Sequence, residues 1–336
     1  MRSASNVQTP ARLCKLFSRS ISLSRSLSLT RFPLGRYEDA FSPALQAPRT
    51  SNWNVTYPDH HWLIRQQPPM TMEQANKSDV LYRTRWQALL SVDDLVADVV
   101  SAVERAAAAN GRKGYVIFSS DHGYRFGQFR MPQGKWNVYE NDISIPWLIM
   151  GPGVAPGSTF SHIASQVDTM PTILGLAGVD TPSTMDGRSL APLLLSAALD
   201  EAPSTARAHV ARERAVGRGT RAAWRTEQLI EYYGLGPVIR YEHMEDNPNN
   251  TFRALRVYDE AQPAGRRNVK LVQFTGQENW NFSAVVATYP YEWELFDIDR
   301  DPSETTNLYA AADKTWLAAL FASLEKLYAC QGATCN

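Results

Sequence analysis

The sequence predicts an α/β protein in which helices cover both faces of a sheet. A long apolar pattern at helical spacing, between residues 86 and 103, precedes a short β-branched run at residues 115–120. A second short apolar run covers residues 143–150. Neither run alternates strictly between apolar and polar residues, which is typical of strands in sheets that are covered on both faces. Helix-then-strand order of this kind indicates an α/β layer architecture.

The composition fits a folded protein and excludes several classes. Of the 336 residues, 44% are hydrophobic and 20% are charged, so the chain can bury a sizeable core. The 34 basic and 34 acidic residues give a net charge of zero, which excludes a nucleic-acid binder that depends on bulk charge. No apolar run approaches the roughly 18 residues of a transmembrane helix. Three cysteines are too few for a disulfide scaffold.

Residues 1–36 depart from this average, because they are rich in serine and contain basic residues but no acidic ones. This composition is typical of a transit peptide, and arginines interrupt every apolar stretch that could serve as a secretory signal. The alternative is a start without a biological role. Under both interpretations we expect a disordered leader. Its basic residues are Arg2, Arg12, Lys15, Arg19, Arg25, Arg31 and Arg36.

Prolines and the spacing of apolar residues predict the first elements after the leader. Residues 37–80 contain many prolines and predict an extended, irregular chain. The helix that follows has one apolar face, and Asn110 and Gly111 end it. The apolar positions of that face are Trp86, Leu89, Leu90, Leu95, Val96, Val99, Val100 and Val103.

A shorter helix is predicted over residues 171–177. Asp168 or Thr169 can cap its start, and Gly178 can end it. Six arginines within residues 201–225 then indicate a linker or a solvated helix, with a basic binding patch as the alternative.

The last third of the chain predicts strands and one helix. From residue 226 the pattern becomes strand-like, most clearly at residues 229–233 and 269–274. A helix near residues 313–328 closes the chain.

Asp121 and His122 form the strongest local signal for chemistry. They follow the predicted strand at residues 115–120, and α/β sheets place their sites just past the carboxyl ends of strands. An aspartate suits a hard cation such as calcium, and a histidine widens the choice of metal. Gly123 allows a sharp turn beside the ion. The alternative is a capped strand end with a surface histidine.

Lys135 lies 14 residues after Asp121, in a loop rich in glycine and proline. A lysine in such a loop is normally solvated, and its functional interpretation is an ammonium group that binds an anion. The other histidines show no metalloprotease spacing. They are His60, His61, His162, His209 and His243.

Cys330 and Cys335 lie close together near the C-terminus. Gly332 between them makes a small disulfide feasible in an oxidising compartment. Zinc is the alternative, but no second pair of ligands accompanies the two cysteines. Four Asn-x-Ser/Thr triplets point, together with the cysteine pair, to the secretory pathway. The triplets begin at Asn54, Asn76, Asn249 and Asn281.

Many segments, in order along the chain, resemble the sulfatase family. The resemblance is dense over residues 37–200, looser over 226–336, and absent from 1–36. Residues 61–66 and 85–94 are similar to the N-acetylglucosamine-6-sulfatase and fungal arylsulfatase branch. The segments include Ser120-Asp121-His122-Gly123-Tyr124, Gly127-Gln128, Lys135, Tyr139-Glu140, Ile145-Pro146, Gly151-Pro152-Gly153, Met185-Asp186-Gly187-Arg188 and Asp301-Pro302-Ser303-Glu304.

The resemblance implies an alkaline-phosphatase-like α/β fold, with a partial central sheet, flanking helices and a smaller C-terminal antiparallel sheet. It implies hydrolysis of sulfate esters of sugars or aryl alcohols, in a secreted or lysosomal protein. By match, Asp121 and His122 would be calcium ligands and Lys135 would bind the sulfate. Three residues within or beside the resembling segments are weaker candidates for substrate contact. They are His61, Arg65 and Gln128.

One departure from the family concerns the nucleophile, a formylglycine made from the cysteine of a C-x-P-x-R motif. This chain has no such motif, and Cys14 is followed by Lys-Leu-Phe-Ser. The family's paired aspartates, which are further calcium ligands, are also missing. We therefore expect the C-terminal half of a sulfatase, in a truncated or inactive form. The alternatives are a non-catalytic remnant and a two-metal phosphoesterase of the same superfamily.

The resemblance also predicts how the chain is organised. We expect a leader (1–36), the C-terminal part of a catalytic domain (37–200), an arginine-rich linker (201–225) and a C-terminal subdomain (226–336).

Overall fold

The computed structural model describes residues 35–195, 199–215, 220, 224–234, 238–240, 243–247, 249–275 and 292–335. The predicted leader, apart from its last two residues, and the triplet at Asn281 lie outside the described residues. The helices are α2 (Trp62–Arg65), α3 (Met72–Ala109), α4 (Glu140–Ile143), α5 (Thr169–Ala177), α6 (Ala191–Leu194), α7 (Ser204–Ala215) and α8 (Lys314–Ala329). The strands are β1 (Val116–Ser119), β2 (Trp147–Met150), β3 (Glu227–Tyr232), β4 (Val238–Arg240), β5 (His243–Asp246), β6 (Thr251–Tyr258), β7 (Asn268–Thr275) and β8 (Glu292–Asp297).

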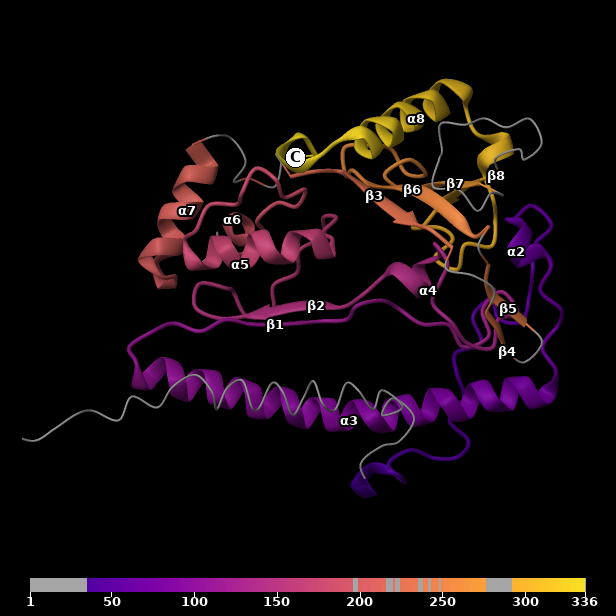
Figure 1. Cartoon of the computed structure of the whole chain (residues 1–336), viewed down its shortest axis with the longest axis horizontal. Helices are drawn as coiled ribbons and strands as arrows, with labels where there is room; N and C mark the ends of the chain where they lie inside the picture. Colours follow the sequence, from indigo (N-terminus) through magenta and orange to yellow (C-terminus); the bar gives the residue numbers. More distant parts are fainter. Residues whose placement is uncertain are drawn as a thin grey trace, which may run out of the picture.

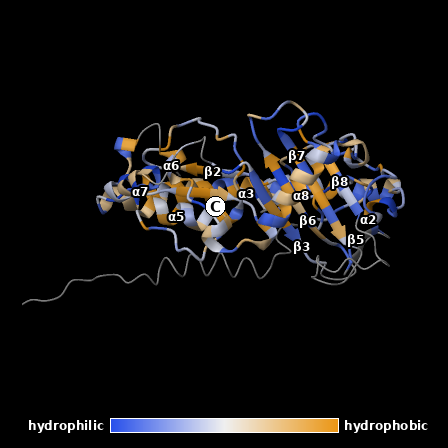
Figure 2. Cartoon of the chain, turned by 90° about the horizontal axis from the view of Figure 1, so that it is seen from above, coloured by the Kyte–Doolittle hydropathy of each residue, from blue (hydrophilic) through white to orange (hydrophobic). Residues whose placement is uncertain are grey.

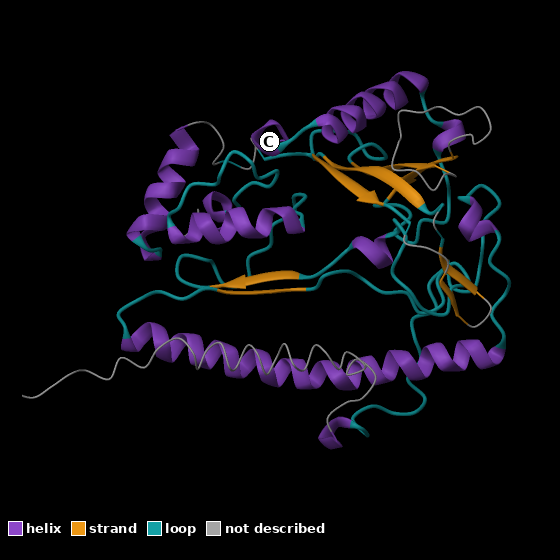
Figure 3. Ribbon diagram, viewed as in Figure 1, coloured by secondary structure: helices purple, strands orange, loops and turns teal. Residues whose placement is uncertain are grey.

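Two sheets organise most of the described chain (Figures 1 and 3). In the first part, α5, α6 and α7 lie on one side of the pair β1–β2, and the long helix α3 runs along the other side. In the second part, an antiparallel sheet has the strand order β3-β6-β7-β8, and α8 lies across it. The predicted α/β class, the C-terminal antiparallel sheet and the closing helix are therefore confirmed.

Helix α3 begins earlier than the sequence predicts and ends where it predicts, beside Asn110. Thr71 and Gln74 form a capping box, in which the backbone N–H of each residue donates to the side chain of the other. This arrangement satisfies two backbone donors that a helix end leaves open. The expectation of irregular chain is therefore wrong for residues 72–80, because the cap starts the helix before the apolar face begins.

The apolar face of α3 is largely open. Trp86, Leu89, Leu95 and Val99 keep between 42% and 53% of their surface exposed. Their spacing predicts a face that packs against a neighbouring layer. Among the described residues, that layer is missing over most of the length of the helix.

The sheet β1–β2 also differs from the expectation. Its two strands pair antiparallel, and Leu148 and Met150 of β2 remain 60% and 43% exposed. A cavity of about 1200 Å³ lies between this sheet and the C-terminal part of α3. The prediction that both faces are covered is wrong, because only two strands are described here and α3 does not close onto them. Strand β2 is also shorter than predicted, since residues 140–143 form the turn α4.

The second sheet is well buried. One face packs on α8, and the opposite face packs on the segment around Val138. Figure 2 shows apolar residues along the strands beneath α8. Each fully buried leucine or phenylalanine in such a core contributes about 1.5–3 kcal/mol. The strand residues in this core are Leu255, Val257, Val269, Leu271 and Leu295, and α8 contributes Leu317, Leu320 and Leu324.

The shorter helices follow their predicted signals. Gly178 ends α5 with φ of +81°, a conformation that glycine adopts without steric cost. Within the predicted linker, α7 is a helix that buries Ala206 and Val210 against neighbouring helices and pairs Arg212 with Asp180 at 2.8 Å. This segment is therefore packed on one side rather than solvated all round.

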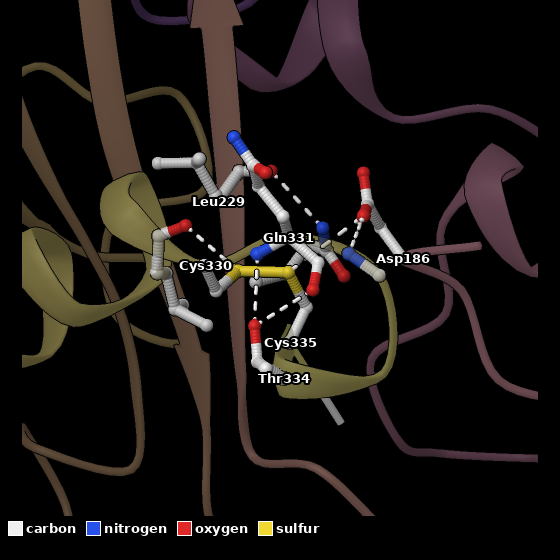
Figure 4. Close-up of a disulfide and its surroundings, with 9 residues drawn as sticks. Asp186, Leu229, Cys330, Gln331, Thr334 and Cys335 are labelled. Atoms are coloured by element: carbon white, nitrogen blue, oxygen red, sulfur yellow. Dashed lines mark hydrogen bonds between the residues drawn. A yellow bond between two sulfur atoms is a disulfide. The ribbon is translucent and has the colours of Figure 1, made fainter. Parts of the chain in front are cut away.

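A disulfide joins Cys330 to Cys335 just after α8 (Figure 4). The small loop it closes lies against the first part of the molecule. The backbone N–H of Gly332 donates to Asp186 at 2.5 Å, and that of Ala333 donates to the carbonyl of Ser183 at 2.8 Å. The disulfide loop thus links the end of the chain to residues 183–186.

Candidate functional site

A cavity of about 760 Å³ lies between the two parts of the molecule. One wall comes from the residues after β1, from α4 and from the start of β2. The other lining residues come mainly from β3, β6 and the loop that leads into α5. The sequence predicts a site just past the end of β1, and this cavity lies there.

Asp121 and His122 stand at one edge of the cavity. The Asp121 side chain is 82% exposed, and its Oδ2 lies 3.2 Å from Nε2 of His122. The Nδ1 atom of His122 lies 2.7 Å from the carbonyl oxygen of Gly123, which places the ring proton on Nδ1. Nε2 therefore presents a lone pair on the same side as the Asp121 carboxylate, and both groups can meet a cation.

Gly123 allows the chain to pass close to α4. A Cβ atom at this position would lie 2.0 Å from the carbonyl oxygen of Asn141. The Gly123 N–H donates to the carbonyl of Asp142 at 2.8 Å. This close approach joins the Asp121–His122 turn to the helix on the neighbouring wall.

Lys135 returns to the same place, and its Nζ contacts Nε2 of His122. The loop between them closes on itself, because the Arg125 N–H donates to the carbonyl of Gly134 at 2.9 Å. Arg125 is fully buried and pairs with Asp142, with 3.0 Å between Nε and Oδ1. Burial raises the pKa of Asp142 to about 6, although Arg125 opposes this shift. The buried pair thus holds the loop that carries Lys135.

A charged cluster beneath the cavity joins α4 to the second sheet. Lys270 of β7 is fully buried, with its Nζ 2.6 Å from the carbonyl of Val138, 3.2 Å from Glu140 and 2.5 Å from Glu304. Burial raises the pKa of Glu304 to about 7, against the opposing effect of Lys270. Burial also acts to raise the pKa of Glu140, but Lys270 and Arg256 outweigh it and the pKa lies below its ordinary value.

The three weaker candidates from the sequence do not line this cavity. His61 is 1% exposed and stacks on Phe274 at 3.9 Å, and burial holds its pKa well below the ordinary value. Arg65 pairs with Glu292 at 2.8 Å. Gln128 is 3% exposed and accepts a hydrogen bond from a neighbouring backbone N–H.

Three of the four Asn-x-Ser/Thr triplets lie within the described residues, and their asparagines differ in solvent exposure. Asn54 is half-buried, and its side-chain oxygen accepts a hydrogen bond from the Met70 N–H at 2.8 Å. Asn249 is also half-buried, whereas Asn76 is exposed. In the triplet of Asn76, the Ser78 hydroxyl is buried in the start of α3.

The described residues do not make up a complete calcium site. None of them form a group of three or more His, Cys, Asp or Glu side chains suited to a metal ion. Asp121 and His122 can supply two donors, whereas calcium takes roughly six to eight oxygen ligands. The pair therefore fits part of a calcium site but not a whole one.

Sequence reasoning missed several polar residues that the fold brings to the cavity. Asn137, Asp142, His162 and Gln166 all line it. Asp142 lies two residues after Tyr139-Glu140, one of the segments that resemble the family. This closeness is a weak sequence signal that Asp142 belongs to the site. His162 shows no recognisable ligand spacing, so only the fold reveals its position.

Comparison with known proteins identifies the domain. The sulfatase family model matches residues 42–179. Those residues belong to the sulfatase family. The resemblance drawn from the residues alone is thereby confirmed.

Individual sulfatases match a larger part of the chain. Human N-acetylglucosamine-6-sulfatase is 32% identical over 319 residues, which cover 90% of this chain and 50% of that protein. The arylsulfatase of Volvox carteri is 30% identical over 315 residues, which cover 90% of this chain and 43% of that protein. The chain thus spans about half the length of the curated relatives it matches.

A solved structure shows the same fold. A protein in complex with its substrate D-glucosamine-2-N,6-O-disulfate superposes with a TM-score of 0.54 at 24% identity, covering 76% of this chain and 42% of that one. The fold is therefore that of the alkaline-phosphatase-like sulfatases, as the resemblance implies.

Proposed function

We propose that this chain binds sulfate esters of sugars, the substrates of a sulfuric ester hydrolase, through the site formed by Asp121, His122 and Lys135. The observation that carries the proposal is the convergence of these side chains at one edge of a 760 Å³ cavity. Lys135 supplies an ammonium group for the sulfate oxygens. Asp121 and His122 would be two ligands of a calcium ion.

The residues of the chain have distinct roles in this proposal. The Gly123 carbonyl fixes the His122 tautomer, so that Nε2 can accept a hydrogen bond or bind a cation. Lys135, which contacts that nitrogen, carries the positive charge that attracts an anion to this edge. Preorganised charge of this kind stabilises negative charge on a transferring group. Calcium, when bound, would supply further positive charge to the sulfate.

We further propose that the chain itself does not turn over sulfate esters and represents a truncated or inactive form. None of its cysteines stands in a C-x-P-x-R motif, and Cys330 and Cys335 form a disulfide. Among the described residues, α3 and β1–β2 leave apolar side chains exposed, as expected for an incomplete central sheet. The alternative is a non-catalytic remnant that keeps the fold without the chemistry.

The substrate class and the location are also proposals. The human relative is named for N-acetylglucosamine 6-sulfate, and the solved structure contains a glucosamine disulfate. A 6-sulfated glucosamine is therefore the first ligand to test, before a simple aryl sulfate. A disulfide favours an oxidising compartment, secreted or lysosomal. None of the described helices is both long and apolar enough to span a membrane.

Two measurements test the proposal. Calorimetry should show that the chain binds glucosamine 6-sulfate and that Lys135→Ala weakens binding at least tenfold. Lys326→Ala, an exposed lysine on α8, is the matched control and should bind as the parent does. A chromogenic aryl sulfate should not be hydrolysed by the 336-residue chain. Turnover that disappears in Lys135→Ala would overturn the proposed inactivity, and equal binding by Lys135→Ala would overturn the site.

A further inference from the structure

Residues 161–166 of the loop at residues 158–166 line the same cavity as Lys135, and the loop is hydrogen-bonded to the end of the strand that precedes Asp121. The side-chain amide of Gln166 donates to the backbone carbonyl of Ser120 at 2.6 Å and to that of Asp121 at 3.1 Å. These residues are far apart in the sequence. The two hydrogen bonds keep the loop beside the candidate sulfate site.

Contacts with Trp224 and Asp168 also hold the loop at residues 158–166 in place. The indole N–H of Trp224 donates to the carbonyl of Ile163 at 2.7 Å. The ring of Phe160 lies edge-to-face with Trp224 at 5.9 Å. The Ser165 N–H donates to the buried carboxylate of Asp168 at 2.9 Å. A loop with this many anchors presents its side chains in a fixed geometry, as a recognition site requires.

His162 is the side chain that this loop brings to the cavity. Its ring stacks on Phe160, with centroids 5.0 Å apart and planes at 23°, and lies 6.4 Å from the ring of Tyr258. The Nδ1 atom is shielded from solvent and has no hydrogen-bond partner in the described part of the chain. A proton on Nδ1 would bury a donor without an acceptor, which costs free energy. The neutral ring therefore carries its proton on Nε2, as a donor for a ligand.

The partners of the lining cations indicate where a sulfate group would bind. Arg256, a second cation on the lining, is occupied by Glu140 at 3.3 Å and by the Asn268 side chain at 2.6 Å. Lys135, by contrast, lies beside His122, and no carboxylate among the described residues forms an ion pair with it. A sulfate group is therefore expected at Lys135, with the body of its ligand extending across the cavity.

We propose that His162 contacts the sugar ring of a 6-sulfated glucosamine and donates Nε2–H to a hydroxyl or N-acyl oxygen. This inference rests on the proposed function, because it assumes that Lys135 holds the sulfate. Aromatic side chains flank the position and can cover the apolar faces of a pyranose ring. Those that line the cavity include Trp136, Trp147 and Tyr258. A volume of about 760 Å³ lies within the usual range of small-molecule sites.

Histidine side-chain NMR tests this inference without requiring turnover. The ¹⁵N-labelled full chain is titrated in turn with inorganic sulfate, D-glucosamine and D-glucosamine 6-sulfate. We expect sulfate to shift the ring signals of His122 but not those of His162. Glucosamine 6-sulfate should shift both rings. His209, which is buried among α5 and α7, should not respond to any of the three.

The outcomes distinguish this inference from the proposed function. If glucosamine 6-sulfate shifts His122 but leaves His162 unchanged, the inference is wrong and the proposed site stands. If inorganic sulfate alone shifts His162, that residue binds the anion and the inference is also wrong. If neither ring responds to any probe, the proposed function fails and the inference fails with it.

A variant provides a second readout. His162→Ala should weaken binding of glucosamine 6-sulfate about three- to tenfold, as for the loss of one hydrogen bond, and should leave the affinity for inorganic sulfate unchanged. Thr159→Ala, at an exposed position of the same loop that does not line this cavity, is the control and should change neither affinity. Equal loss for both ligands in His162→Ala would indicate a structural role and would overturn the inference.

Discussion

The two sheets of the molecule contrast in how completely they are covered. Strands β6 and β7 run for eight residues each, and most of their side chains are buried between α8 and the segment around Val138. Strands β1 and β2 run for four residues each and leave Leu148 and Met150 exposed. Both regions have apolar, β-branched strands. The difference shows that an apolar strand is buried only when neighbouring layers are present.

The largest change in stability is expected at Lys270, a buried charge in the well-covered sheet. Lys270→Met should lower the free energy of unfolding by about 3–5 kcal/mol, because Glu304 would lose its buried partner. Urea unfolding followed by tryptophan fluorescence measures the change. Lys326→Met, which removes an exposed charge from α8, should have almost no effect. A loss below about 1 kcal/mol for Lys270→Met would contradict the role given to this cluster.

Matched truncations compare the two sheets directly. Leu271→Ala in β7 should cost about 2–5 kcal/mol, because it opens a hole in a close-packed core. Leu148→Ala in β2 should cost less than about 0.5 kcal/mol, since that side chain is 60% exposed. Equal losses in urea unfolding would show that β2 is covered in solution.

The folded protein should be more stable at mildly acidic pH than at neutral pH, because of the buried carboxyl group of Glu304. Burial raises the pKa of Glu304 to about 7, so the folded state binds more protons than the unfolded state above the ordinary carboxyl pKa. Stability is therefore expected to fall, on the order of 1–3 kcal/mol, as the pH rises from about 4.5 to about 7.5. Denaturation curves across this range measure the slope.

Glu304→Gln separates this effect from general charge effects. The variant cannot ionise, so its stability should depend less on pH across the same window. Glu104→Gln, at an exposed position on α3, should keep the parent slope. An unchanged slope in Glu304→Gln would assign the pH dependence to other groups, such as Asp142.

The last prediction concerns the disulfide that closes the C-terminal loop, which contacts residues 183–186. Cys330→Ser with Cys335→Ser should lower stability by about 2 kcal/mol, because the closed loop is short. Thermal unfolding measures the shift, and Cys14→Ser serves as a control that leaves the pair intact. No change in the double variant would mean that contacts around Asp186 hold the loop unaided.

Sequence reasoning predicted much of the fold, and it selected three side chains that lie together at the candidate site, although their roles stay predictions. The long helix, the strand at residues 269–274 and the closing helix are confirmed, because spacing and capping residues act within one element. The structure brings together Asp121, His122 and Lys135, which one segment of chain carries. His162 could not be placed, because its position depends on Gln166 meeting the carbonyl of Ser120.

The sequence by itself determined which segments form helices and strands and which short stretch bears the candidate site. These properties depend on neighbours within a few residues, such as the capping box at Thr71 or the turn at Gly178. Only the tertiary structure decided which apolar faces are covered, and it buried His61 away from the cavity. Burial depends on contacts between segments far apart in the chain, and no local pattern specifies those contacts.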